Sequence, residues 1–95
     1  MRLFIDIETN GISDFSRLSD LKKIHCIAMI PFDTDIAGEG PAMLFVDGQF
    51  DKAVEMLKAA KEIVGHNIIG FDLRAIKRVL GWVPAWDQTV RDTLV

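Results

Sequence analysis

The chain has 95 residues, enough for one small domain at most. Its 11 lysines and arginines against 14 aspartates and glutamates give a formal net charge of −3, and 49% of its residues are hydrophobic. This composition predicts a globular fold and excludes a disordered chain or a broadly basic nucleic-acid coat protein. A single cysteine, Cys26, excludes an internal disulfide and favours a reducing compartment. Without an apolar run long enough for a membrane or a signal peptide, we expect a cytoplasmic protein with no membrane partner.

The segment 2–8 predicts the first strand. Leu3, Ile5 and Ile7 alternate with Phe4, Asp6 and Glu8, so the two sets point to opposite faces. Because both faces carry apolar residues, the pattern indicates a central strand that is covered on each side.

The order of the remaining elements predicts the fold class. The patterns predict strands over 24–30 and 42–46, a helix from Phe50 to residues 60–61, a strand over 62–65 and a helix over 68–80. The order β-β-β-α-β-α is typical of a mixed α/β sheet with helices packed on it. The first three strands are close enough in sequence for an antiparallel meander. The fourth follows a helix, so it can lie parallel to a neighbouring strand.

Several residues mark the ends of these elements. Pro31 ends the second strand, and Asp47-Gly48 forms a tight turn after the third. Gly81 stands at the C-terminal end of the second predicted helix. Residues 90–95 predict a strand end and then a helix start with Asp92 or Thr93 as its N-cap. Since the sequence stops there on two apolar residues, we expect a domain truncated at its C-terminus.

Three carboxylates are candidates for chemistry. Asp6 and Glu8 leave the same face of the first strand about 6–7 Å apart. A bound Mg²⁺ or Mn²⁺ ion, which prefers such oxygen ligands, would offset the repulsion between the two carboxylates. The alternative is that both carboxylates lie at a strand end in solvent and are hydrated. Asp72 lies on the buried stripe of the second predicted helix, with Ile76. It is either a charge that interacts favourably with the helix dipole or a third metal ligand.

His66 and Asn67 lie between the fourth strand and the second helix. Asn67 is either an N-cap or a functional residue, and His66 is a ligand, a general base or an ordinary loop residue, which we favour.

Two further groups are open to a functional interpretation. Arg74, Lys77 and Arg78 cluster on the polar side of the helix, where they either guide a nucleic-acid strand by its phosphates or form a solvated basic face. Trp82 and Trp86 either stack on bases or cover apolar surface. For both groups we favour the structural alternative.

Two segments resemble the motifs of a known enzyme family. Residues 6–12 (DIETNGI) resemble the first motif of the DEDD (DnaQ-like) 3′–5′ exonucleases, which reads D-x-E-T, a variable residue, glycine and an aliphatic residue. Residues 66–72 (HNIIGFD) resemble the second motif, H-N, a short spacer and F-D, and residues 92–94 resemble the D-T-x segment that follows it. The resemblance runs through nearly all of the chain and is greatest to the proofreading domains of phage-type family A DNA polymerases.

The resemblance implies an RNase H-like fold and two-metal hydrolysis of phosphodiester bonds at the 3′ end of single-stranded DNA. It implies that Asp6 holds both Mg²⁺ or Mn²⁺ ions, that Glu8 holds one, and that Asp72 is the third acidic ligand; these are the expected catalytic residues. The substrate-binding residues that it implies are Thr9, Asn10, Gly11, Ile12, Asn67 and Phe71. Of these, Phe71 either buttresses the helix or lies near the second base.

The third motif of the family is absent. It consists of Tyr or His and, a few residues later, a fourth Asp, whereas this chain has no tyrosine and no histidine after His66. We therefore expect residues 1–95 to be one partial exonuclease domain, the N-terminal portion of a DNA polymerase chain in a bacterial or phage-infected cell. The alternatives are an RNA exonuclease of the same superfamily and a non-enzymatic remnant. Such a remnant would self-associate through exposed apolar surface and bind metal or nucleic acid weakly.

Overall fold

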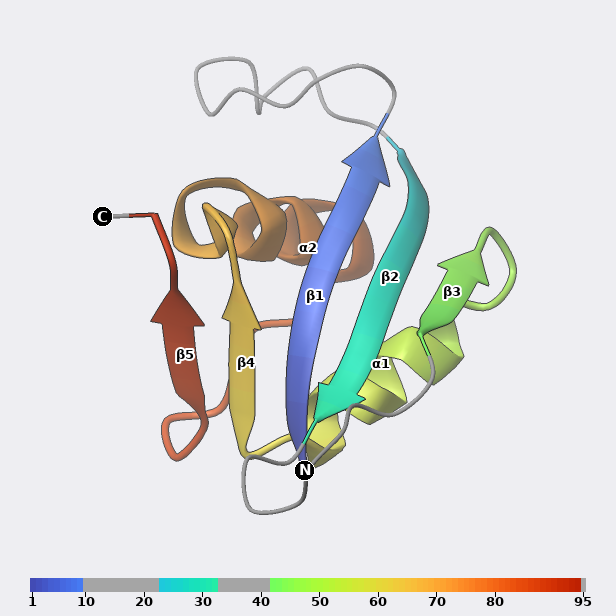
Figure 1. Ribbon diagram of the computed structural model, residues 1–95. Helices are drawn as coiled ribbons and strands as arrows, with labels where there is room; N and C mark the ends of the chain where they lie inside the picture. The colour runs from blue at the N-terminus through green and yellow to red at the C-terminus, as the bar shows by residue number, and fades with distance from the viewer. Residues whose placement is uncertain (10–22, 33–41, 95) are drawn as a thin grey trace.

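The computed structural model describes residues 1–9, 23–32 and 42–94, which form one five-stranded sheet and its helices. The elements are β1 Arg2–Thr9, β2 Ile24–Phe32, β3 Met43–Val46, α1 Phe50–Ala59, β4 Glu62–Gly65, the π-helical turn η2 Ile68–Asp72, α2 Leu73–Leu80 and β5 Thr89–Asp92. The strand order is β3-β2-β1-β4-β5 (Figure 1). β1, β2 and β3 pair antiparallel, while β4 is parallel to both β1 and β5. The predicted mixed sheet of an RNase H-like α/β fold is confirmed.

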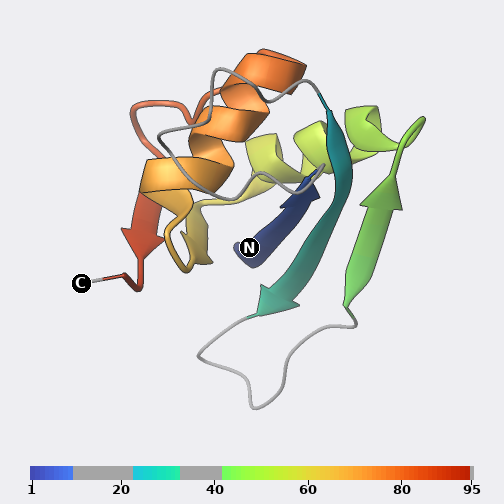
Figure 2. The same ribbon diagram turned by 90° about the horizontal axis from the view of Figure 1, so that it is seen from above.

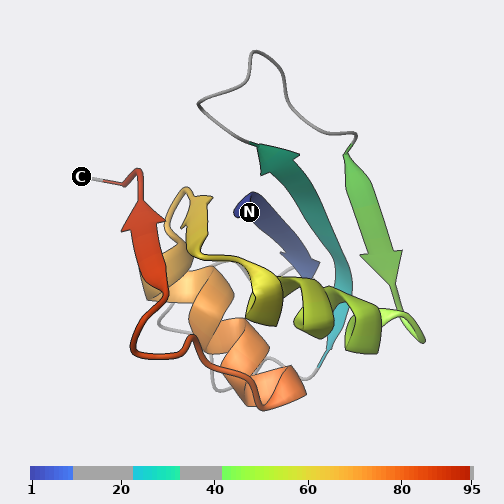
Figure 3. The same ribbon diagram turned by 90° about the horizontal axis from the view of Figure 1, so that it is seen from below.

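The two helices cover one face of this sheet. Figures 2 and 3 show α1 and α2 on the same side of the strands. Leu3, Ile5 and Ile7 of β1 point to that side and are buried, as the alternation predicted. Phe4 lies on the opposite face and is 39% exposed, and Leu44 of β3 is 62% exposed. β1 is therefore central, but the prediction that it is covered on both faces is wrong for the described residues, because both helices return on the same side.

The core lies between the sheet and the helices. It consists of Leu3, Ile5, Ile7, Ile24, Ile27, Met29, Ala53, Leu57, Ala60, Ile63, Ile68, Phe71, Ala75 and Ile76. Small residues at Ala53 and Ala75 let the helix axes approach the strands, and the branched residues between them fill the space. Burying each large aliphatic side chain stabilises the fold by roughly 1.5–3 kcal/mol before conformational entropy is counted. No helix in the described part of the chain is long and apolar enough to cross a membrane.

Most predicted element ends agree with the structure to within one or two residues, but two differ in kind. β2 continues through Pro31 to Phe32, because β3 pairs only with Cys26 to Met29 and needs no N–H from Pro31. The second predicted helix begins as the π-turn η2, and regular α-helix starts only at Leu73. Its other end is as predicted: Gly81 has φ 74° and donates its N–H to Lys77 O at 3.0 Å.

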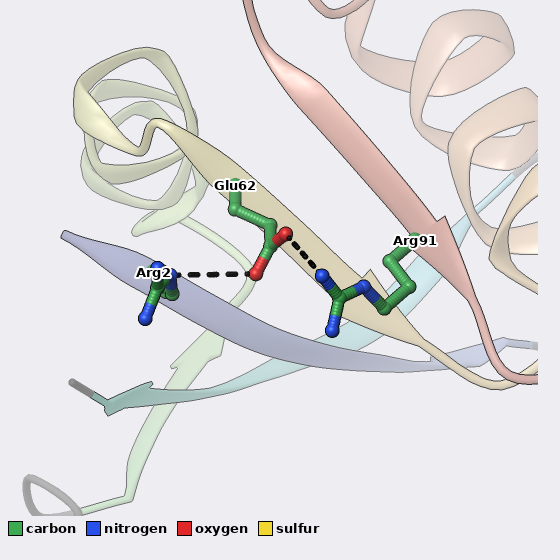
Figure 4. A network of polar contacts seen from close by, with 3 residues as sticks. All are labelled: Arg2, Glu62 and Arg91. Carbon is green, nitrogen blue, oxygen red and sulfur yellow. Dashed lines mark hydrogen bonds and ion pairs between the residues drawn. The ribbon is translucent and has the colours of Figure 1, made fainter. Parts of the chain in front are cut away.

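The amino edge of the parallel strands carries a charged cluster. Glu62, at the start of β4, is buried between two arginines from its neighbouring strands (Figure 4). Its Oε1 lies 3.5 Å from Nε of Arg2, and its Oε2 lies 3.1 Å from Nη2 of Arg91. The buried carboxylate is thus compensated by opposite charge from β1 and β5.

Candidate functional site

β1 and β4 separate toward their carboxyl ends. Their parallel ladder joins Arg2–Phe4 to Glu62–Val64 and stops there, while β1 stays paired with β2 as far as Thr9. In the described structure, the second half of β1 therefore has no strand on its β4 side. The N–H of Ile7 is instead bonded to Oδ2 of Asp72 at 3.2 Å. The end of η2 thus reaches the edge of β1 between Asp6 and Glu8.

Asp72 is only 5% exposed, whereas Asp6 and Glu8 are exposed on the face of β1 that the helices leave open. Burial raises the pKa of Asp72 from its ordinary value of 3.8 to about 7. The hydrogen bond from the Ile7 N–H opposes this rise, and the negative charges of Asp6 and then Asp92 add to it. A carboxylate that is desolvated beside other carboxylates is typical of a functional site.

The donor chemistry of this site fits a hard divalent cation. Asp6, Glu8 and Asp72 offer only carboxylate oxygens, the ligands that Mg²⁺ and Mn²⁺ prefer. Asp6 is near enough to Asp72 to raise its pKa. Over residues 1–9, 23–32 and 42–94, however, no three Asp, Glu, His or Cys side chains are grouped closely enough to hold an ion. The structure thus brings Asp72 to β1, and convergence of all three carboxylates on one ion stays a prediction.

Only some of the expected nucleotide-binding residues are among those that the structure describes. Thr9 is the last residue of β1 and follows a register shift in the pairing with β2. Asn10, Gly11 and Ile12 lie outside the described residues. Phe71 is buried in the core, which agrees with its expected role as a buttress of the helix.

Asn67 stands at the N-cap position of η2, but its side chain does not cap the helix. It has the left-handed conformation (φ 58°, ψ 31°), whereas an N-cap residue is normally extended, and its side chain makes no capping hydrogen bond. Its carbonyl accepts the N–H of Phe71 at 3.0 Å. A Cβ atom on Gly70 would lie 2.7 Å from Asn67 Oδ1, so a larger residue at that position would displace the Asn67 side chain. The N-cap alternative for Asn67 is therefore right about its position and wrong about its side chain.

A side chain from β5 caps η2 instead. Asp92, the last residue of β5, accepts the N–H of Asn67 at 2.7 Å and that of Ile69 at 2.9 Å. Desolvation opposes ionisation of Asp92, but hydrogen bonds from Leu94, Ile69 and Asn67, together with the charge of His66, lower its pKa. Asp92 is also a predicted N-cap of a helix that starts after β5. Its Oδ1 accepts the N–H of Leu94 at 2.9 Å, but Thr93 and Leu94 are not helical, so a helix start there stays a prediction. The spacing of residues along the chain did not predict that Asp92 also accepts hydrogen bonds at the start of η2.

The other candidate residues have structural surroundings. His66 is exposed beside Thr93, with Nδ1 3.3 Å from Oγ1, as suits a loop residue. Trp82 packs against the core, which confirms the structural interpretation. Trp86 is 97% exposed and lies in the segment between α2 and β5. Arg74, Lys77 and Arg78 are exposed on α2, as their spacing predicted.

Comparisons with known proteins relate this fold to DNA polymerases. No protein-family model matches the chain. No curated protein matches it either. Among solved structures it is similar to the family B DNA polymerase from the hyperthermophilic archaeon Pyrobaculum calidifontis, with a TM-score of 0.53 and 26% sequence identity over 87% of this chain and 11% of that chain. The chain has a polymerase-related fold.

The structural similarity supports a less specific conclusion than the resemblance of the two motifs does. The matched structure is a family B enzyme, whereas the motifs at residues 6–12 and 66–72 led us to expect family A. A relationship to DNA polymerases is common to both, and the subclass stays a prediction. The chain spans about a tenth of the matched polymerase.

Proposed function

We propose that this chain is the N-terminal portion of a metal-dependent 3′–5′ exonuclease domain of a DNA polymerase. The observation that supports the proposal is the hydrogen bond between Asp72 and Ile7, which are 65 residues apart. It brings the carboxylate of the second motif to the strand that carries Asp6 and Glu8, the carboxylates of the first. A polymerase-related fold agrees with this function.

In this proposal Asp6, Glu8 and Asp72 hold two Mg²⁺ or Mn²⁺ ions, which supply charge stabilisation at the attacked phosphate and at the leaving oxygen. The fold shields one of these ligands from solvent: Asp72 is buried, and the Ile7 N–H holds its carboxylate in position. Metal ligands must be deprotonated, so the pKa of about 7 at Asp72 makes cation binding stronger at pH 8 than at pH 6.

The remaining site residues orient the substrate in this proposal. Thr9, Asn10, Gly11 and Ile12 contact the terminal nucleotide of a single strand, as the resemblance implies. Asn67 also contributes to substrate binding, and Phe71 supports this site from the core. DNA is the proposed substrate, and an RNA strand of the same sequence tests the alternative.

The uncovered sheet face favours a second candidate, a non-enzymatic chain that self-associates. Phe4, Leu44 and Val46 are 39%, 62% and 43% exposed on strands of the sheet. Apolar surface contributes roughly 25 cal/mol per Å² when it is buried, so a few hundred Å² favours association by several kcal/mol before entropy is counted. Under this alternative the chain sediments as a dimer or larger at micromolar concentration and binds Mn²⁺ weakly if at all.

Mn²⁺ binding tests the proposed function on this chain. Calorimetric titration at pH 8 should show binding to the wild type, loss of binding in Asp6→Ala, and unchanged binding in Asp51→Ala. Asp51 is a matched control because it is an exposed aspartate in the first turn of α1. Wild type without affinity for Mn²⁺, or Asp6→Ala with the wild-type affinity, would contradict the proposal.

Digestion of a 5′-labelled single strand provides the second readout. Because the third motif is absent, we expect negligible turnover by the 95-residue chain. A longer chain that continues this sequence through a third motif should shorten the strand from its 3′ end with Mg²⁺ or Mn²⁺. Asp6→Ala should abolish that activity, because Asp6 is the ligand proposed to bridge both ions. Retained activity in Asp6→Ala would mean that the chemistry lies elsewhere.

A further inference from the structure

Asp92 has a fixed place at the end of β5. The parallel ladder pairs it with Gly65, the last residue of β4. Immediately after it, the N–H of Thr93 donates to Gly65 O at 2.9 Å, so the two strands remain joined up to the edge of the sheet. The backbone of Asp92 is thus held by the sheet, which makes its carboxylate a fixed point for whatever it contacts.

Both oxygens of that carboxylate contact the segment that leads to Asp72. Oδ1 accepts the N–H of Asn67 at 2.7 Å, and Oδ2 accepts that of Ile69 at 2.9 Å. These donors are 25 and 23 residues away in sequence. One ionised side chain therefore satisfies two backbone N–H groups around the start of η2, where a helix has no internal partners for them.

The turn held in this way determines which direction Asp72 faces. In η2 the N–H of Leu73 bonds to Ile68 O, five residues back, where an α-helix would use four. One residue more or fewer in a helical turn rotates everything after it by about 100°. If the segment relaxed to α-helix, Asp72 would turn away from β1 and lose its bond to the Ile7 N–H. Such π-turns occur frequently at functional sites.

We propose that Asp92 is a positioning residue of the candidate site: by holding the N–H groups of Asn67 and Ile69 it keeps η2 in register and Asp72 against Ile7. The proposal rests on the proposed function in treating Asp72 as a metal ligand. It adds a fourth acidic residue to the site, one that acts through the backbone and touches neither metal nor substrate.

Asp92→Asn tests this with little change of shape. The amide keeps one acceptor oxygen and loses the other, so one of the two bonds to η2 is broken. Amide hydrogen exchange should become faster at Ile7, relative to Ile5 in the same strand. Mn²⁺ affinity should fall about 10- to 100-fold, as is usual when a residue that orients a ligand is changed. Asp92→Glu keeps the charge, misplaces it by one methylene and should give a smaller loss on both readouts.

Asp87→Asn is the matched control, since Asp87 is an exposed aspartate just before β5, and neither readout should change. A lower melting temperature in Asp92→Asn with unchanged Ile7 exchange and unchanged Mn²⁺ affinity would overturn the positioning role. Wild type that binds no Mn²⁺ would overturn the proposed function instead. The exchange measurement needs no metal, so it still decides whether Asp92 holds Asp72.

Discussion

Glu62 and Asp72 are the two buried acidic side chains of the described structure. Glu62 lies at the amino end of the parallel strands, and Asp72 lies toward their carboxyl end. Glu62, at the amino edge, is paired with arginines from both neighbouring strands. At the carboxyl edge, Asp72 accepts a backbone N–H, and the charges that act on its pKa are those of Asp6 and Asp92, both negative. A buried carboxylate between two cations is explained by the fold, whereas one beside other carboxylates is typical of a functional site, and the proposed function makes that site a cation site.

The largest expected effect comes from removing the charge of Asp72. Its pKa is raised by burial, so its contribution to the free energy of unfolding is fully present below about pH 4 and is lost as the pH rises through about 7. Asp72→Asn removes this loss. At pH 4 the variant should match the wild type, and at pH 8 it should be more stable by roughly 2–4 kcal/mol. Urea unfolding of both proteins at the two pH values measures the difference. If the free energy of unfolding changed equally with pH in the wild type and the variant, the prediction would be contradicted.

Glu62→Gln should have the opposite sign. It is isosteric, but it removes the negative charge between Arg2 and Arg91 and leaves weaker hydrogen bonds in its place. We expect a loss of about 1–3 kcal/mol at pH 7, below the cost of breaking a fully buried pair because Arg91 is exposed. Urea unfolding measures this loss directly. Stabilisation by both Asp72→Asn and Glu62→Gln at pH 8 would remove the contrast between the two carboxylates.

Arg91→Ala should have the smallest effect of the three. The Arg91 side chain is 67% exposed, so solvent screens its attraction to Glu62, and we expect a loss of less than about 1 kcal/mol. The loss should shrink further in 1 M salt, where the screening length is about 3 Å. Thermal unfolding with and without salt measures it. A loss that exceeds that of Glu62→Gln would mean that Arg91 acts through packing.

Much of the fold could be predicted because its signals are local. Alternation in residues 2–8, the turn at Asp47-Gly48 and the glycine at Gly81 each depend on a few neighbouring residues, and the structure agrees with all three. The prediction that both faces of β1 are covered was wrong, because alternation shows which residues share a side and not what packs there.

The site was predicted less completely for a related reason. Periodicity selected Asp72 as a carboxylate on the buried stripe, and its contact with β1 agrees with that choice. Five residues of apolar pattern cannot distinguish a π-turn from an α-turn, so η2 was missed. The hydrogen bonds that Asp92 accepts from Asn67 and Ile69 join residues more than twenty positions apart, beyond the reach of any spacing rule.

The central position of β1 also affects the order of folding. β1 precedes every other described element in the chain, yet its parallel partner β4 begins only at Glu62. The hairpin of β1 and β2 needs a short loop closure, whereas the β1–β4 pairing and the Asp72–Ile7 bond need much longer ones, which form more slowly. Until β4 arrives, one side of β1 exposes unpaired N–H and C=O groups, where another chain can add as a strand. The candidate site is therefore completed late, and the interval before its completion is when the chain is most exposed to aggregation.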